Sequence, residues 1–239
     1  MPADSIWTKN EACVATGGQC EMNWVAQGVS IDSRTVEYGD LFIALVGPNM
    51  DGHKFVAQAF ERGAVAAIVS RKPDNFDPSW PLVMVEDTQQ ALEGLGIFAR
   101  DRVGAHICAV TGSVGKTGTK EALRLVLGEQ GSTSANLGSL NNHWGLPLSL
   151  ARLPADSAYG IFEMGMNHPG EIRPMSRLTR PHVALITAVT SSSVSIIEQN
   201  WNGSGKATFG YSNGFIASRG NGWVPAGWVH AKANTSGGG

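Results

Sequence analysis

The segment from residue 106 to residue 127 constrains the fold of this chain more than any other. An apolar run at 106–110 leads into a turn at 111–117 that reads Thr-Gly-Ser-Val-Gly-Lys-Thr, and a helical pattern follows. Glycines in such a turn let backbone N–H groups point toward phosphate oxygens, and the helix adds its positive N-terminal end. The helical pattern places four apolar residues on one side: Ala122, Leu123, Val126 and Leu127. This order predicts a parallel α/β sheet with a phosphate-binding loop.

The turn supplies the candidate nucleotide-binding residues, which are Gly112, Ser113, Gly115, Lys116 and Thr117. Lys116 would reach the terminal phosphates, and the hydroxyl of Thr117 would hold Mg²⁺. The strict pattern places a glycine where Val110 stands, so the loop is a shortened variant. A plain glycine turn with an exposed lysine stays open as the alternative.

A metal partner is expected at the end of the apolar strand 159–162, where Glu163 follows. An acid at the carboxyl end of a parallel strand, near a phosphate loop, suits Mg²⁺. Lys116 and Glu163 are therefore the candidate catalytic residues, and Thr117 and Glu163 the candidate metal ligands. Glu163 alone could equally be an acid at a strand edge, and the pair Asn141-Asn142 either binds substrate or shapes a turn.

The first part of the chain alternates strand and helix patterns. Strands are predicted at 28–32, 40–46, 64–69 and 82–85, with a helix at 53–62. Asp87 can cap a helix that buries apolar residues on one face. We therefore predict a small N-terminal α/β domain (1–86), a linker helix (87–104) and a central parallel-sheet domain with a P-loop (105–189).

Composition excludes several classes of protein. The 239 residues carry a net charge of −2, which argues against a strongly basic nucleic-acid binder. We find no apolar run of the roughly 18–20 residues that span a bilayer and no secretory signal. The three cysteines are scattered, which predicts reduced thiols in a cytoplasmic protein.

The composition changes near residue 190. Residues 190–239 contain four charged residues but ten of the 30 glycines and three of the seven tryptophans. This predicts a Gly/Trp-rich β-type tail joined at a seam between residues 189 and 190.

Several motifs match one family in its order. The turn at 111–117 resembles the ATP loop of the Mur ligases, the ATP-dependent amino-acid ligases of peptidoglycan synthesis. Residues 139–142 and 162–172 look like the central domain of that family. The segments 32–34, 39–45 and 51–55 resemble its N-terminal, UDP-substrate domain. The likeness runs from about residue 7 to residue 189.

This resemblance implies a reaction and its substrates. ATP, with Mg²⁺, would phosphorylate the terminal carboxylate of UDP-MurNAc-tripeptide, and the amine of D-alanyl-D-alanine would attack the acyl phosphate. Ser33 and Arg34 would face the uridine diphosphate, since hydroxyl and guanidinium donors suit a diphosphate. Asn141 and Asn142 would lie near substrate at the domain junction. A structural Ser-Arg turn at 33–34 remains the alternative.

The likeness stops at residue 189, so we expect an incomplete central domain that is inactive on its own and has an exposed sheet edge open to association. The tail resembles the end of a CHAP domain, a cysteine/histidine amidohydrolase that cuts peptidoglycan. His182, Glu198 and Asn200 would then be remnants of its site. A wall hydrolase is therefore the alternative function, with an inactive appendage as the plainer interpretation of the tail.

Overall fold

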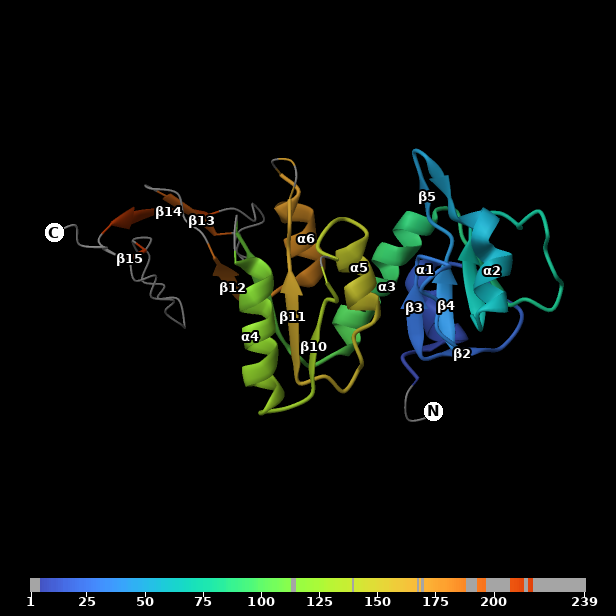
Figure 1. The fold of residues 1–239 in the computed structure, drawn as a ribbon, viewed down its shortest axis with the longest axis horizontal. Helices are drawn as coiled ribbons and strands as arrows, with labels where there is room; N and C mark the ends of the chain where they lie inside the picture. Colours follow the sequence, from blue (N-terminus) through green and yellow to red (C-terminus); the bar gives the residue numbers. More distant parts are fainter. Residues whose placement is uncertain are drawn as a thin grey trace.

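Two parallel sheets stand side by side and are joined by a long helix (Figure 1). The computed structural model describes residues 5–112, 115–138, 140–166, 168, 170–187, 193–196, 207–212 and 215–216. The α/β class predicted from the sequence is confirmed.

The N-terminal sheet contains four parallel strands in the order β3-β4-β7-β8. Their bounds are β3 Gly28–Ser30, β4 Asp40–Ile43, β7 Ala66–Val69 and β8 Leu82–Met84. Around it lie the antiparallel pair β1 (Trp7–Thr8) and β2 (Val25–Ala26), the hairpin β5 (Val46–Gly47) and β6 (Met50–Asp51), and the helices α1 (Lys9–Thr16), η1 (Gly52–Phe55) and α2 (Val56–Glu61).

Both faces of this sheet are covered, which explains the continuous apolar runs in β4 and β7. Along β4, Leu41 and Ile43 face the core shared with α1 and α3, whereas Phe42 faces the core under α2. Side chains alternate across a strand, so a strand buried on both faces needs apolar residues at every position.

Helix α3 (Thr88–Arg102) begins as predicted at Asp87, whose carboxylate accepts hydrogen bonds from the backbone N–H groups of Gln89 and Gln90. Its buried residues Leu92 and Leu95 belong to the same core as Leu148 of the central part. The core therefore crosses the predicted domain boundaries, and the division at residues 86 and 104 stays a prediction.

The central sheet is also parallel, in the order β10-β11-β9-β12. Its strands are β9 His106–Thr111, β10 Thr133–Ala135, β11 Tyr159–Glu163 and β12 Val183–Ile186. Its helices are α4 Lys116–Gly128, α5 Gly145–Ala151 and α6 Ile172–Thr179. Phe162, Leu146 and Met175 are buried in the core between β9, β11, α5 and α6.

Helix α4 differs from its predicted packing. Leu123 and Leu127 are half-buried, but Ala122 is exposed and the side chain of Val126 is 61% exposed. The fully buried residue of α4 is Lys120. The rotation of α4 about its own axis directs Lys120 inward, and the apolar pattern alone did not reveal this.

Polar contacts join the two halves. The indole Nε1 of Trp7 donates to the carbonyl of Ala151 (2.8 Å), and Nε of Arg152 donates to the carbonyl of Val29 (2.6 Å).

Three short antiparallel strands follow the central sheet: β13 Ser193–Ile196, β14 Ala207–Ser212 and β15 Phe215–Ile216. Within the described residues, no helix combines the length and apolar character that crossing a membrane requires.

Candidate active site

Three neighbouring strands of the central sheet end at one edge, and each delivers part of a polar cluster. Strand β9 leads into the turn before α4, β10 leads into the segment that begins at Asn136, and β11 ends at Glu163. The carboxyl ends of parallel strands meet at the same edge of a sheet, where ligands bind in open α/β folds.

The described residues of the turn include two glycines with positive φ angles. Gly112 has φ 142° and Gly115 has φ 78°, a conformation that favours glycine. Gly115 is the N-cap of α4 and makes no side-chain capping bond, so the first N–H groups of the helix face the turn. The ammonium of Lys116 lies over the turn and donates to the carbonyl of Gly112 (2.9 Å). Ser113 lies outside the described residues.

Glu163 is the centre of the cluster and is only 2% exposed. Its Oε2 accepts a hydrogen bond from the hydroxyl of Thr117 (2.9 Å), and its Oε1 accepts one from Nδ2 of Asn141 (2.8 Å). The structure thus brings together three predicted site residues from different segments of the chain.

Two residues that the sequence did not single out support this arrangement. The side-chain oxygen of Asn136 accepts the backbone N–H of Glu163 (2.8 Å). A Cβ placed on Gly165 would lie 2.8 Å from the amide group of Asn141, so any residue larger than glycine would clash with the Asn141 side chain. Asn136 follows a strand directly, which is the one signal that pointed to it.

The donor set fits Mg²⁺. The hydroxyl of Thr117 and the carboxylate of Glu163 are hard oxygen donors 2.9 Å apart. Mg²⁺ commonly takes one or two protein oxygens and completes its octahedron with water and phosphate oxygens. Within the described part of the chain, no three His, Cys, Asp or Glu residues form a metal cluster, as a zinc site would require.

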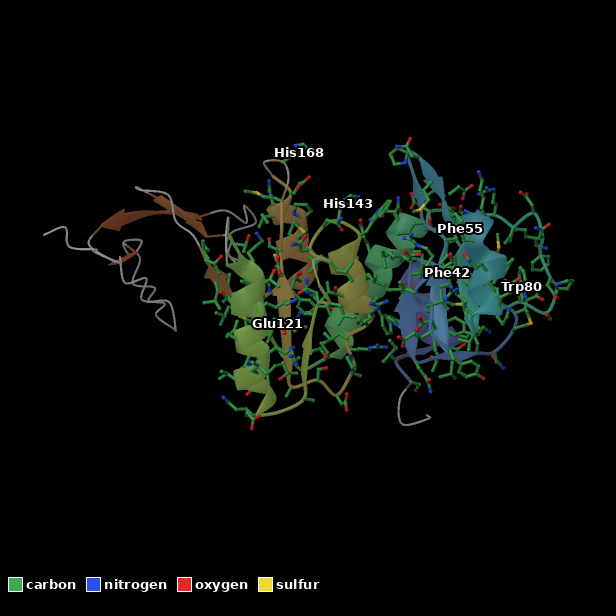
Figure 2. All side chains as sticks on the ribbon, viewed as in Figure 1. Phe42, Phe55, Trp80, Glu121, His143 and His168 are labelled. Atoms are coloured by element: carbon green, nitrogen blue, oxygen red, sulfur yellow. The ribbon has the colours of Figure 1, made fainter. Side chains whose placement is uncertain are left out.

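Asn142 has a different place from Asn141. Its side-chain oxygen accepts the backbone N–H groups of Trp144 (3.1 Å) and Gly145 (2.8 Å), which starts helix α5. A Cβ on Gly47 would lie 3.0 Å from the indole of Trp144, so this loop packs on the hairpin β5–β6 of the N-terminal part. His143 stands between Asn142 and Trp144 in the chain. It lies at the same edge of the molecule as His168 (Figure 2) and as the hairpin β5–β6 (Figure 1).

Ser33 and Arg34 lie in the loop after β3, at the carboxyl edge of the N-terminal sheet. The hydroxyl of Ser33 is buried and donates to Oε1 of Gln58 (2.6 Å). The guanidinium of Arg34 is exposed and pairs with Asp32 (2.6 Å). The two residues are not part of the cluster around Glu163.

Of the three residues named for the hydrolase alternative, the described part of the chain includes His182. His182 lies at the opposite, amino-terminal edge of the central sheet, where its Nδ1 accepts the N–H of Ile107 (2.8 Å); burial, with Arg100 nearby, lowers its pKa. Burial raises the pKa of the Cys108 thiol to about 11, so this thiol is a poor nucleophile at neutral pH. Glu198 and Asn200 lie outside the described residues.

Two family models match the chain. The model described as the Mur ligase middle domain covers residues 110–196, and the model described as the Mur ligase family, catalytic domain, covers residues 25–98. The first match continues past the predicted seam at residues 189/190. Neither family model supports the amidohydrolase-like interpretation of the tail.

Individual proteins are similar over the same region. The UDP-N-acetylmuramoyl-tripeptide–D-alanyl-D-alanine ligase of Rickettsia prowazekii is 37% identical over 187 residues, which are 78% of this chain and 41% of that ligase. A crystal structure of MurF from Acinetobacter baumannii has a TM-score of 0.68 at 36% identity and covers 80% of this chain and 42% of its own. The MurF ligase of Thermotoga maritima, solved in complex with ADP, has a TM-score of 0.53 at 32% identity, covering 68% and 38%. The chain spans about two fifths of the length of these relatives.

Proposed function

Because the chain belongs to the Mur ligase family, we propose that it supplies the nucleotide-binding and UDP-substrate-binding parts of a ligase that joins D-alanyl-D-alanine to UDP-MurNAc-tripeptide. The observation that carries the proposal is the contact of Thr117 and Asn141 with the two carboxylate oxygens of Glu163, beside a glycine turn at the start of α4. The names of the similar ligases support the choice of substrates, and the cluster supports the choice of a nucleotide.

The proposed reaction has two steps. The γ-phosphoryl group of ATP moves to an oxygen of the tripeptide's terminal carboxylate, which gives an acyl phosphate and ADP. The amine of D-alanyl-D-alanine then attacks the carbonyl carbon and forms a C–N bond. The C–O bond to the phosphoryl group breaks, inorganic phosphate leaves with that oxygen and the electron pair, and the nitrogen loses a proton. Such phosphoryl transfer depends on alignment and neutralisation of charge more than on covalent help from side chains.

Each residue of the cluster has a proposed task. Lys116 would leave the carbonyl of Gly112 and neutralise charge on the β- and γ-phosphates, while the N–H groups around Gly115 would bind phosphate oxygens. Thr117 and Glu163 would hold Mg²⁺, which supplies positive charge to the transferring phosphoryl group. Asn141 would keep the Glu163 carboxylate oriented.

The substrate side is proposed at the carboxyl edge of the N-terminal sheet, which lies on the same side of the molecule as the cluster (Figure 1). The exposed guanidinium of Arg34 can exchange Asp32 for a diphosphate, because a surface ion pair is weak. Ser33 would act through its backbone and through Gln58, since its hydroxyl is buried.

The whole reaction is proposed for the ligase to which these residues correspond, and ligand binding is proposed for this chain itself. A cytoplasmic location is part of the same proposal, as is association through the edge of β12, which is one of the two outer strands of the described central sheet.

The test is titration calorimetry of the chain with MgADP and, separately, with UDP-MurNAc-tripeptide. We expect both ligands to bind. Lys116→Ala should weaken the binding of MgADP by about tenfold or more and leave the binding of UDP-MurNAc-tripeptide unchanged. Arg34→Ala should weaken the binding of UDP-MurNAc-tripeptide by a similar factor and leave the binding of MgADP unchanged. Arg124→Gln, on the exposed side of α4, is the matched control and should bind both ligands like the unmodified chain. Flat titrations with both ligands by a folded chain would refute the proposed function.

A further inference from the structure

A fully buried lysine lies behind the candidate site. Lys120 is one turn into α4 and 0% exposed, and its ammonium donates to the backbone carbonyls of Asn136 (2.8 Å) and Gly138 (3.2 Å). Oε1 of Glu121 lies 3.2 Å from the same nitrogen, on the outer side of the helix. A buried ammonium is costly unless it is fully hydrogen-bonded, so these contacts demand a specific placement of the 136–138 backbone.

The segment held by Lys120 in turn holds the candidate metal ligand. Asn136 uses its side-chain oxygen to accept the N–H of Glu163 (2.8 Å) and its side-chain nitrogen to donate to the carbonyls of Leu140 (3.0 Å) and Glu163 (3.4 Å). Asn136 is 2% exposed. The residue after Leu140, Asn141, donates to the carboxylate of Glu163. The contacts therefore run without a break from α4 through 136–141 to both the backbone and the side chain of Glu163.

Helix α4 also carries Thr117, which contacts the other carboxylate oxygen of Glu163. Lys120 lies three residues after Thr117, close to one helical turn, so the two side chains project from neighbouring turns of one face. Lys120 thus joins the helix that presents Thr117 to the segment in which Asn136 contacts Glu163. Among the described hydrogen bonds, none joins Lys120 to Glu163 directly.

We propose that Lys120 and Asn136 are positioning residues for Mg²⁺-nucleotide binding: together they tie α4 to the 136–141 segment and thereby hold the Glu163 carboxylate opposite the Thr117 hydroxyl. The inference rests on the proposed function, because it assigns these residues to the Mg²⁺ side of that same site. Neither residue is assigned a contact with the nucleotide or the metal.

The inference is tested by the Mg²⁺ dependence of ADP affinity, measured as the ratio of the dissociation constants in EDTA and in saturating Mg²⁺. Lys120→Met keeps an unbranched apolar side chain as far as Cε and removes the ammonium, and Asn136→Ala breaks the link from its other end. We expect each substitution to reduce this ratio by about tenfold, as loss of a group behind a metal ligand typically does. ADP affinity in EDTA should change less than twofold.

A second readout needs no nucleotide. Hydrogen exchange of the Glu163 backbone amide, which donates to Asn136, should become faster in both variants. The double variant should lose no more Mg²⁺ dependence than either single one, because both break one chain of contacts. Arg124→Met, which removes an exposed cation from the same helix, is the matched control and should change neither readout.

The outcomes separate the two proposals. If the unmodified chain does not bind ADP, the proposed function fails. If it binds with a clear Mg²⁺ dependence and the folded variants keep that dependence and the slow exchange at Glu163, the positioning role is overturned. Should Lys120→Met not fold, Asn136→Ala decides by the same two readouts.

Discussion

At the scale of single residues, side chains of one type differ by what surrounds them. Arg34 is exposed and pairs with Asp32, whereas Arg102 stacks on the ring of Trp7 at 4.4 Å and has a pKa lowered by burial. Lys116 lies over the phosphate-type turn, and Lys120 lies behind it. Position relative to the turn, and not residue type, therefore separates Lys116, the proposed phosphate ligand, from the buried Lys120.

Cys108 gives a prediction at this scale. Its pKa of about 11, raised by burial in β9, leaves on the order of one thiol in a thousand ionised at pH 8. We expect Cys108 in the folded chain to react with a thiol reagent at pH 8 at least tenfold more slowly than after unfolding. The measurement is mass spectrometry of labelled peptides over time. Labelling of native Cys108 as fast as that of the unfolded chain would contradict this expectation and reopen a nucleophilic role.

At the scale of elements, the sequence predicted the four strands of the N-terminal parallel sheet, β9, β11 and the helix at Asp87, because apolar runs and caps are local signals. It did not predict β10. The meeting of Thr117 with Glu163 also followed, since both were placed at carboxyl ends of strands in one parallel sheet. The roles of Asn136 and Lys120 were missed because they depend on strand order and helix rotation. No local sequence pattern indicates that β10 lies next to β11, or that Lys120 faces the sheet.

Gly165 carries a prediction about the end of β11. A Cβ there would approach the amide of Asn141 to 2.8 Å, so Gly165→Ala must push that side chain away from Glu163. We expect a loss of about 1–3 kcal/mol in the free energy of unfolding, together with weaker Mg²⁺-dependent ADP binding. Urea unfolding and calorimetry measure the two effects. Gly128→Ala is the control, because a Cβ at Gly128 meets open space; equal effects of both substitutions would refute the steric argument.

The hairpin β5–β6 ends at Asp51, whose hydrogen bonds with Arg71 and His53 form a cluster, called here the Asp51 clasp, that makes stability depend on pH. Asp51 accepts hydrogen bonds from Arg71 and from Nδ1 of the buried His53, whose Nε2 accepts the N–H of Ser70 (2.9 Å). The pairing with Arg71, followed by the bonds from His53, lowers the pKa of Asp51 well below its ordinary value. The native state thus keeps Asp51 ionised where the unfolded chain takes up a proton.

Stability from this clasp is complete above the ordinary pKa of an aspartate, near 4, and is lost as the pH falls below it. Asp51→Asn should lower the free energy of unfolding at pH 7 by about 1–3 kcal/mol and make stability fall less steeply between pH 4 and pH 2. Urea unfolding at a series of pH values tests this. Identical slopes for the variant and the unmodified chain would contradict the prediction.

At the scale of the whole molecule, α5 packs in both halves. Its Leu148 and Ala151 belong to the core of the N-terminal sheet, and its Leu146 and Leu150 belong to the core of the central sheet. Polar contacts from Trp7 and Arg152 cross the same junction. A helix that is packed in both cores predicts that the two sheets unfold in a single transition, although two sheets suggest two independent units. Hydrogen exchange of the buried backbone amides in β4 and in β9 should become faster over the same range of urea concentration. Earlier loss of protection in β9, with β4 still protected, would show that the halves are independent.

The side-by-side placement also sets both carboxyl edges on one side of the molecule (Figure 1), so a ligand at the N-terminal edge and a nucleotide at the central edge would face the same space. The loop at 141–144 is the bridge, because Asn141 contacts Glu163 while Trp144 packs on Gly47. This link between the halves had no signature in the sequence beyond a loop rich in Gly, Asn and Ser.

The most direct measurement is a crystal structure of the chain with ADP and Mn²⁺, a stand-in for Mg²⁺ that is located by its anomalous scattering. We predict the metal within about 2.5 Å of the Thr117 hydroxyl, with Glu163 bound directly or through one water, and the β-phosphate on the N–H groups at the start of α4. An ADP bound away from that turn, or a metal with no contact to Thr117 or Glu163, would contradict the proposed nucleotide site.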